Sequence, residues 1–318
     1  MYASDAEKLE QICCPVCKSD DCEVVDERTG GGKHLRSVIC RRCSHVYLNP
    51  RASQAAYDDF YRSGFSEGFN QIDDKESLVG LAASNDAKTA RLIKFIAPHL
   101  RPGMKVLEIG AGYGNILAVL RDKHGASEVV GIEPDPIGQK VAQEVFGLDL
   151  LSGVLADHIG DFSDKKFDLI IMHHVLEHFL DPDEIGEALQ KLCAEEGMVY
   201  VGVPNVCALT VPRELYFRFP HVQYFSPFSL FLFLWRSGFK VVDRKGFDQP
   251  LTLLACPIAS AQPMLSWTEA RAVSIPYRKV ISRVRWGNMR QRARLFFRDK
   301  VKPVVPKGIK EMLKKALH

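Results

Sequence analysis

The segment that most constrains this chain is residues 105–123, where an apolar run ends in closely spaced glycines and a helical pattern begins. The glycines stand at alternate positions: Gly110, Gly112 and Gly114. A strand, a glycine turn and a helix in this order are typical of the nucleotide-binding corner of an α/β sheet. Glycine suits such a turn because it adopts φ angles that other residues avoid, and because the backbone must approach a ligand closely.

Two carboxylates indicate which ligand this corner binds. Glu108 lies at the end of the first strand, where it would repel phosphates, and the glycine spacing differs from the G-x-G-x-x-G of a dinucleotide site. A second apolar strand ends at Glu133, where a carboxylate can accept hydrogen bonds from both ribose hydroxyls of an adenosine. A ligand with adenosine at one end and an amine and a sulfonium at the other suits both carboxylates. The sequence therefore predicts S-adenosylmethionine as the cofactor.

Strand and helix patterns alternate through the middle of the chain. The predicted strands are residues 105–109, 129–133, 148–151, 167–172, 197–203, 239–244 and 251–256. The predicted helices are residues 86–100, 115–123, 136–146, 183–194 and 227–237. Strands joined by crossover helices predict an α/β fold with a Rossmann-like, doubly wound, mostly parallel sheet. Ligands of such sheets bind outside the carboxyl ends of the strands.

With these motifs in order, the chain resembles class I S-adenosylmethionine-dependent methyltransferases. Residues 167–178 are similar to their fourth strand and its functional end, and residues 197–205 to their fifth strand and the following turn. The run His-Val-Gln-Tyr-Phe-Ser at residues 221–226 resembles a segment of bacterial sugar and small-molecule C- or O-methyltransferases. The resemblance covers roughly residues 1–256, including an N-terminal zinc ribbon.

The resemblance implies roles for individual residues. The expected cofactor-binding residues are Glu108, Gly110, Gly112, Gly114, Glu133, Leu155, Asp157 and His174, with Leu155 and Asp157 beside the adenine. His221 is the expected general base, with Tyr224 as its neighbour and His178 as a second catalytic candidate; histidine suits proton removal because its pKa lies near neutral pH. Tyr61 is the expected substrate-pocket residue. Core packing, or hydrogen bonding to loop backbone, is the alternative for each residue taken alone.

Four of the nine cysteines form two C-x-x-C pairs near the N-terminus: Cys14 with Cys17, and Cys40 with Cys43. Thiolates placed on two facing turns supply a tetrahedral set for zinc. Reduced or redox-active thiol pairs are the alternative. Competing ligands lie close by in the sequence: Cys13, Cys22, His34 and His45. A segment this small has too little core to fold alone, so a structural zinc is expected.

The C-terminal tail is strongly basic. Residues 264–318 contain 15 Lys and Arg against 3 Asp and Glu, although the whole chain carries only +3. An apolar stripe of a predicted helix is formed by Tyr277, Ile281, Val284, Met289, Ala293, Phe296 and Phe297. A basic amphipathic helix of this kind is typical of proteins that bind an anionic membrane surface. The alternative is a helical cap packed on the rest of the protein.

These observations predict four segments: a zinc ribbon at 1–49, a helical linker or lid at 50–100, a methyltransferase domain at 101–260 and the basic tail at 261–318. The polar first residues carry no signal-peptide pattern, so a cytoplasmic protein is expected, held at the inner face of the membrane by its tail. The expected activity is methyl transfer to a small molecule, a sugar or glycan precursor. An RNA methyltransferase and a non-catalytic cofactor-binding adaptor are the alternatives, and the oligomeric state stays open.

Overall fold

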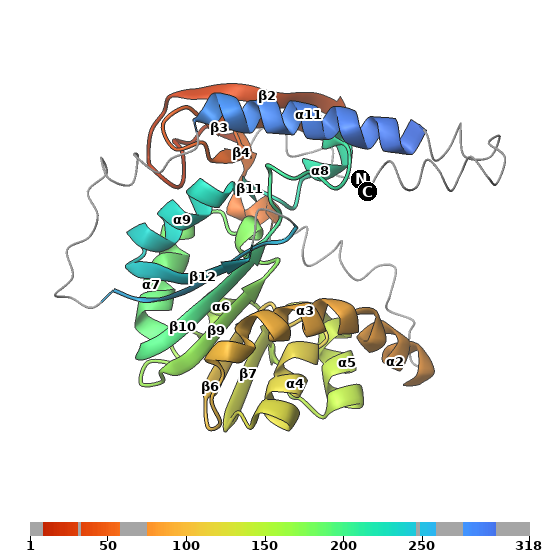
Figure 1. Ribbon diagram of the computed structural model, residues 1–318, viewed down its shortest axis with the longest axis vertical. Coiled ribbons are helices and arrows are strands. Elements are labelled where there is room, and N and C mark those ends of the chain that lie inside the picture. The colour runs from red at the N-terminus through yellow and green to blue at the C-terminus, as the bar shows by residue number, and fades with distance from the viewer. Residues whose placement is uncertain (1–8, 31–32, 58–74, 246–248, 259–275, 297–318) are drawn as a thin grey trace.

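The computed structural model describes residues 9–30, 33–57, 75–245, 249–258 and 276–296. A seven-stranded sheet with the order β12-β13-β10-β9-β6-β7-β8 forms its centre (Figure 1). Its strands are β6 Lys105–Ile109, β7 Glu128–Glu133, β8 Leu151–Ser152, β9 Phe167–His173, β10 Cys193–Val203, β12 Phe239–Lys245 and β13 Leu251–Pro257. The strands from β10 to β8 run parallel, and β13 is antiparallel to both of its neighbours. The predicted α/β class with a mostly parallel sheet is confirmed.

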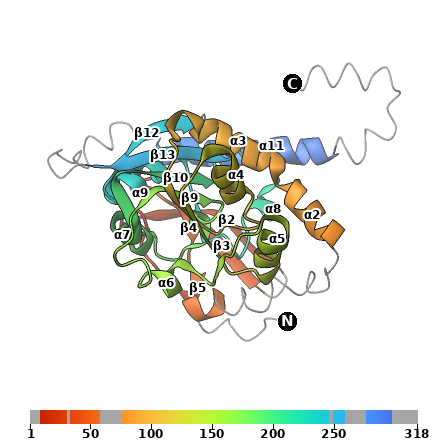
Figure 2. The ribbon, with the colours of Figure 1, turned by 90° about the horizontal axis from the view of Figure 1, so that it is seen from below.

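Helices cover both faces of this sheet (Figures 1 and 2). One face carries α3 Asp86–Ile96, α4 Asn115–His124 and α5 Pro136–Phe146, and the other carries α7 Pro182–Leu192 and α9 Pro227–Arg236; α2 Lys75–Ser84 packs on α5. On β9, Leu169 and Ile171 lie in the core with α3 and α4, whereas Ile170 and Met172 lie in the core with α7 and α9. Successive residues of a strand point to opposite faces, so this apolar strand is buried on both sides.

The strand order reverses at β6. The chain continues from β6 to β7 and β8 on one side, and it returns through β9 and β10 on the other. Doubly wound sheets bind their ligands at such a point, outside the carboxyl ends of the strands. The fold therefore brings Glu108, Glu133 and His173 to one edge, because each lies at or next to the carboxyl end of its strand.

The N-terminal segment forms a second sheet with the order β11-β4-β3-β2, whose strands are β2 Cys22–Gly30, β3 Lys33–Cys40, β4 Val46–Leu48 and β11 Gln223–Tyr224. Its fourth strand, β11, comes from the His221–Ser226 segment and pairs with β4 through Gln223↔Tyr47 and Tyr224↔Val46. A separate pair joins β1 Leu9–Glu10 to β5 Arg51–Ala52. The ribbon therefore shares a sheet with the segment that carries the predicted base, while the four predicted segment boundaries stay predictions.

The helix α11 Tyr277–Phe296 packs against the ribbon, so it is a cap on this side of the protein (Figure 1). Its buried side chains are those of Val280, Ile281, Val284, Asn288 and Gln291. Asn288 Oδ1 accepts the Arg213 N–H at 2.9 Å, and Gln291 Nε2 donates to the Leu209 carbonyl at 2.7 Å. Two polar side chains therefore face inward.

The predicted apolar stripe of this helix is wrong in part. Ile281 and Val284 are buried as expected, but the Met289 side chain is 68% exposed and Ala293 is exposed. The apolar pattern missed the buried face because Asn288 and Gln291 satisfy loop backbone groups there. Phe297 and the predicted pocket residue Tyr61 lie outside the described residues. Within the described part of the chain, no helix is both long and apolar enough to cross a bilayer.

Candidate active site and metal centre

The glycine turn follows β6 and requires glycine at each alternate position. Gly110, Gly112 and Gly114 have φ angles of 70°, 55° and 77°, in the left-handed region that side chains disfavour. Gly110 and Ala111 donate their N–H groups to the Ile132 carbonyl at 2.8 and 3.0 Å, which ties the turn to the end of β7. Gly114 then begins α4. The backbone of this turn therefore lies close to the carboxyl ends of β6 and β7, where a ligand can approach it.

Glu133, at the end of β7, is held in place by the backbone around it. One carboxylate oxygen accepts the Gly112 N–H at 2.6 Å, and the other accepts the Asp135 N–H at 2.9 Å. Burial raises the pKa of Glu133, while these two donors act to lower it. Each oxygen has a second lone pair, so the carboxylate can still accept two hydroxyl groups.

Gly138 was not recognised from the sequence, although it shapes the same corner. A Cβ there would lie 2.7 Å from the Gly112 carbonyl oxygen and 3.0 Å from Glu133 Cγ. The α5 backbone therefore approaches the turn as closely as only glycine permits. The available signal was a glycine inside a helical pattern, two residues after Pro136.

Glu108 is the least satisfied polar group of the site. Its side chain is 2% exposed, and Oε2 has no hydrogen-bond partner among the described residues. Burial raises the pKa of Glu108 well above its usual range, and the nearby Glu133 carboxylate raises it further. A buried carboxyl without a partner costs free energy, which a bound amine or other donor would relieve.

Leu155 and Asp157 lie in the short helix α6 Leu155–His158, which follows β8. Gly153, just before this helix, donates its N–H to the Glu133 carbonyl at 3.3 Å, so the turn borders the Glu133 corner. Leu155 is buried in the core, and Asp157 accepts the Val154 N–H at 2.9 Å. The two residues thus have structural contacts here, and their role beside adenine stays a prediction.

Two histidines lie at the end of β9, on the far side of β6 from Glu133. His173 Nδ1 lies 3.2 Å from the Tyr200 hydroxyl, and burial lowers the pKa of His173 to about 3. His174 has a φ of 61°, unusual for a residue with a side chain, and its Nδ1 lies 3.3 Å from Glu177 Oε1. Both histidines and Tyr200 line a cavity of about 140 Å³.

The Glu177 carboxylate orients His174. Glu177 is 1% exposed, whereas the His174 side chain is 43% exposed. Because Nδ1–H donates to the carboxylate, Nε2 is left as the proton acceptor. A buried carboxylate behind an imidazole is the arrangement by which enzymes hold a general base.

His221, the base expected from the sequence, lies in a different environment. The Arg218 guanidinium donates to His221 Nε2 at 2.9 Å. Burial lowers the pKa of His221 to about 2, and His178 and Arg218 lower it further. Tyr224 is buried beside it, and its hydroxyl donates to the Arg218 carbonyl at 3.1 Å. The base and neighbour roles of this pair therefore stay predictions.

His178 packs edge-on against His221, with 4.8 Å between ring centroids, and its Nδ1–H donates to the Pro220 carbonyl at 2.9 Å. Burial lowers the pKa of His178. Glu177, His178 and His221 bring possible metal ligands within 4.8 Å of one another. The Arg218 cation on His221 Nε2 leaves the proton on Nδ1, so neither nitrogen of this histidine is ready to bind a metal ion.

The four cysteines of the C-x-x-C pairs lie together in the ribbon. Cys14 and Cys43 Sγ atoms are 3.5 Å apart, as are those of Cys17 and Cys40, and all four lie within 4.8 Å of one another. Tetrahedral zinc with bonds near 2.3 Å places its sulfurs about 3.8 Å apart. The four thiols therefore fit zinc.

The two cysteine turns have matching geometry. Lys18 and Ser44 donate their N–H groups to the carbonyls of Cys14 and Cys40, four residues earlier, and have φ angles of 60° and 62°. Burial raises the pKa of Cys14, thiol contacts raise that of Cys43, and contacts with Cys14 lower those of Cys17 and Cys40. A bound cation would let all four ionise together.

Two of the competing ligands are engaged elsewhere or exposed. His45 Nε2 lies 2.6 Å from Gln223 Oε1, and burial lowers the pKa of His45 to about 4. Cys13 is exposed, next to the buried Cys14. The geometry therefore favours the ligand set that the spacing suggested.

Comparison with known proteins identifies a methyltransferase domain in the part of the chain that contains the glycine turn. Residues 81–244, just over half of the chain, match a family model described as a methyltransferase domain. A ribosomal protein L11 methyltransferase of Thermosipho africanus is 34% identical over 116 residues, covering 33% of this chain and 40% of the relative. A ubiquinone biosynthesis O-methyltransferase of Neisseria meningitidis is 26% identical over 160 residues, covering 45% of this chain and 67% of the relative.

The chain thus spans about 40% of the length of the L11 methyltransferases that it matches. Among solved structures, 1,6-didemethyltoxoflavin-N1-methyltransferase of Burkholderia thailandensis has a TM-score of 0.48 and 17% identity, covering 75% of this chain and 100% of that one. The family match lies over the glycine turn, both carboxylates and the end of β9. The chain therefore belongs to the methyltransferase domain family.

Proposed function

We propose that this protein transfers a methyl group from S-adenosylmethionine to a small molecule, a sugar or glycan precursor. The observation that carries the proposal is the buried Oε2 of Glu108, which has no hydrogen-bond partner in the described part of the chain and lies beside the glycine turn, close to Glu133. A dinucleotide would bring phosphates to this carboxylate, whereas the sulfonium donor brings an amine. An amine would stabilise the charged form of this buried carboxyl, whereas a phosphate would disfavour it, so the site favours the methyl donor.

Two residues of this corner would bind different parts of the methyl donor. Glu133 would accept the two ribose hydroxyls, with its carboxylate held in place by Gly112 and Asp135. Glu108 would accept the amine of the methionine part. When bound, the donor supplies an electrophilic methyl group, and the protein's part is to hold the acceptor in line with it and to exclude water.

Proton removal from the acceptor falls to His174 in this proposal. Its imidazole lines the 140 Å³ cavity, and the Glu177 carboxylate holds its Nδ1–H. His221 is less suited because its Nε2 already accepts a hydrogen bond from Arg218. A general base works best with a pKa near the working pH, which does not describe a histidine whose pKa is lowered to about 2.

The size of the cavity favours a small acceptor. A volume of about 140 Å³ holds a small molecule or one part of it, not a nucleic-acid helix. The ribbon contributes to the structure around this site, because its strand β4 pairs with β11. We assign it a structural zinc held by Cys14, Cys17, Cys40 and Cys43.

Methyl-labelled S-adenosylmethionine tests the proposal against its two alternatives. The full chain is incubated with three acceptor pools: low-molecular-mass metabolites including sugar nucleotides, total RNA, and ribosomal protein. Label should enter the metabolite pool. Label in RNA or in protein would contradict the small-molecule assignment. Donor binding without transfer to any pool would support the adaptor alternative.

A further inference from the structure

The cavity beside His174 has a strongly basic lining. Its polar residues include Lys88, Arg91, His173, His174, Tyr200 and Lys245, and none of the described residues that line it is Asp or Glu. Three basic side chains, those of Lys88, Arg91 and Lys245, thus line a cavity of about 140 Å³. Such a concentration of positive charge repels cations and attracts anions.

The helix α3 supplies two of these cations in a regular register. Lys88, Arg91 and Phe95 are three and four residues apart, so they share one face of the helix. Leu92 and Phe95 form the apolar part of the lining next to them. The third cation, Lys245, comes from the end of β12, so the charges meet from two separate elements.

No carboxylate of the described residues pairs with these cations. Lys88 Nζ donates to Asn85 Oδ1 at 3.4 Å, and neither Arg91 nor Lys245 forms an ion pair with any described residue. Their positive charge acts on His173 in the cavity lining: burial is the main cause of its lowered pKa, and Lys88 and Arg91 lower it further. These cations are therefore available to bind a negatively charged ligand.

We propose that the methyl acceptor is an anion whose carboxylate or phosphate group binds between Arg91, Lys88 and Lys245, next to His174. This inference rests on the proposed function, since it assigns the acceptor half of the same site. Tyr200 and Thr252 add hydroxyl donors to the lining. Bound in this way, the acceptor is held at its charged end while its nucleophile faces the methyl donor.

The carboxylate of the donor itself is the competing source of negative charge. The donor residues Glu108 and Glu133 lie on β6 and β7, whereas every strand that contributes to the cavity lining, β9, β10, β12 and β13, lies on the other side of β6. Three cations also exceed the single carboxylate of a donor whose amine faces Glu108. The position and the number of cations therefore favour the acceptor.

Calorimetry on the full chain distinguishes an anionic acceptor from the carboxylate of the methyl donor as the group that these cations bind. Wild type, the double variant Arg91→Gln/Lys245→Gln and the control Lys94→Gln are titrated with S-adenosylhomocysteine and with 5′-methylthioadenosine, which lacks the amino-acid part. Lys94 is an exposed cation on α3 outside the cavity lining. Each protein saturated with S-adenosylhomocysteine is then titrated with inorganic pyrophosphate and with citrate at constant ionic strength.

The expected result is that wild type and Lys94→Gln bind at least one of the two anions, and that the double variant binds it at least about tenfold more weakly because charge-assisted hydrogen bonds are lost. Equal anion affinity in all three proteins, or no anion binding by wild type, would overturn the inference. So would a loss of S-adenosylhomocysteine affinity with unchanged methylthioadenosine affinity, because the cations would then serve the donor. Failure of wild type to bind S-adenosylhomocysteine would instead refute the proposed function.

Discussion

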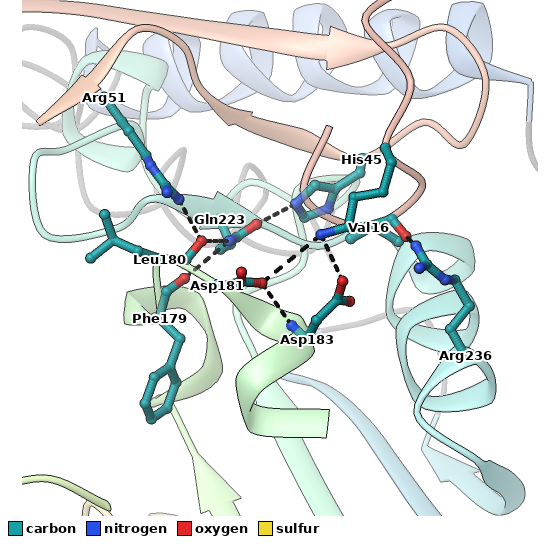
Figure 3. A network of polar contacts seen from close by, with 10 residues as sticks. Val16, His45, Arg51, Phe179, Leu180, Asp181, Asp183, Gln223 and Arg236 are labelled. Carbon is teal, nitrogen blue, oxygen red and sulfur yellow. Dashed lines mark hydrogen bonds and ion pairs between the residues drawn. The ribbon is translucent and has the colours of Figure 1, made fainter. Parts of the chain in front are cut away.

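His45 of the ribbon and Gln223 of β11 share a hydrogen bond of 2.6 Å between Nε2 and Oε1, although 178 residues separate them in the chain (Figure 3). The Gln223 amide also donates to the carbonyls of Phe179 and Leu180, just after His178. One glutamine therefore ties the ribbon to the loop that carries Glu177 and His178. The ribbon is part of the scaffold of the candidate active site.

Other contacts fix the same interface. Lys18 Nζ lies 2.7 Å from an Asp183 carboxylate oxygen. The Arg236 guanidinium donates to the Val16 carbonyl (Figure 3). Lys18 and Val16 belong to the first cysteine turn, so the proposed metal centre and the helices α7 and α9 are in direct contact. Loss of the metal should therefore disturb the methyltransferase domain as well as the ribbon.

The zinc assignment predicts about one zinc ion per chain for a single tetrahedral site. Cys14→Ser should lose the metal and lower the melting temperature, because metal binding stabilises the fold of the ribbon. Cys13→Ser is the matched control, since Cys13 is exposed next to Cys14 and should keep both the zinc and the stability. Elemental analysis decides the question: wild type purified metal-free under reducing conditions without chelator would refute the assignment.

The assignment of His174 as base predicts that His174→Gln lowers kcat by about 10²–10⁴-fold while the affinity for S-adenosylhomocysteine changes little. Glu177→Gln should lower kcat less, because the imidazole stays in the site and loses only the carboxylate that orients it. His221→Gln is the decisive comparison, measured by steady-state kinetics with the same acceptor. A large loss in His221→Gln with near-normal turnover in His174→Gln would return the role to His221.

The stability of the protein should fall in mild acid because His173 is folded as a neutral side chain. Its pKa is about 3 in the folded protein, whereas the unfolded chain takes up the proton near pH 6.5. Between these values the unfolded state binds one more proton, so the free energy of unfolding decreases as the pH falls, by about 1.4 kcal/mol per pH unit for this group. The groups that face His173 are Lys88 and Arg91 of α3, His174 and Tyr200.

Urea denaturation at pH 7, 6 and 5 measures this dependence. His173→Asn should reduce the slope of unfolding free energy against pH by up to about 1.4 kcal/mol per unit relative to wild type, since one proton of differential uptake is removed. Glu108 acts in the opposite sense, because its raised pKa makes the folded state hold a proton longer, but it is present in both proteins. Identical slopes in the two proteins would show that His173 ionises in the folded state.

Local patterns predicted those elements whose signals lie within a few residues. The helix α5 begins after Asp135, whose side chain accepts the Ile137 N–H, and ends at Gly147 with a φ of 61°. The predicted helix 183–194 ends instead at Leu192, because Cys193 already belongs to β10. The predicted helix 86–100 ends as α3 at Ile96, and the next turn is a 3₁₀ helix that contains Pro98. These two errors lie at element boundaries, where local signals are weakest.

Long-range pairing could not be predicted from the sequence. The strand β11 has two residues, and its partner β4 lies more than 170 residues earlier, so neither carries a local signal of the other. Arg218 was also missed as the partner of His221, although it lies only three residues earlier in the chain. Lys88 and Arg91 were missed because cations at helical spacing normally face solvent.

The predicted binding of α11 to an anionic membrane can still be tested on its outward face, because only its inner face is packed against the protein. The side chains of Trp286 and Met289, 61% and 68% exposed, lie one turn apart among arginines such as Arg285 and Arg290. Each cation near an anionic bilayer contributes on the order of 1 kcal/mol within a Debye length. The nuclease-treated full chain should co-sediment with anionic vesicles at low salt, and Trp286→Ser should weaken this attachment. Sedimentation that is absent at low salt, or equal with neutral vesicles, would assign the helix to packing alone.

The most direct test of the account is the affinity of the full chain for S-adenosylhomocysteine, measured by calorimetry in wild type and two variants. Wild type should bind one equivalent, and Glu133→Gln should bind more weakly by about 1–3 kcal/mol, because the ribose hydroxyls lose a charged acceptor. Glu128→Gln, at the other end of β7, where Glu128 pairs with Lys165, should bind like wild type. Unchanged affinity in a folded Glu133→Gln protein, or no binding by wild type, would contradict the placement of the methyl donor at this corner.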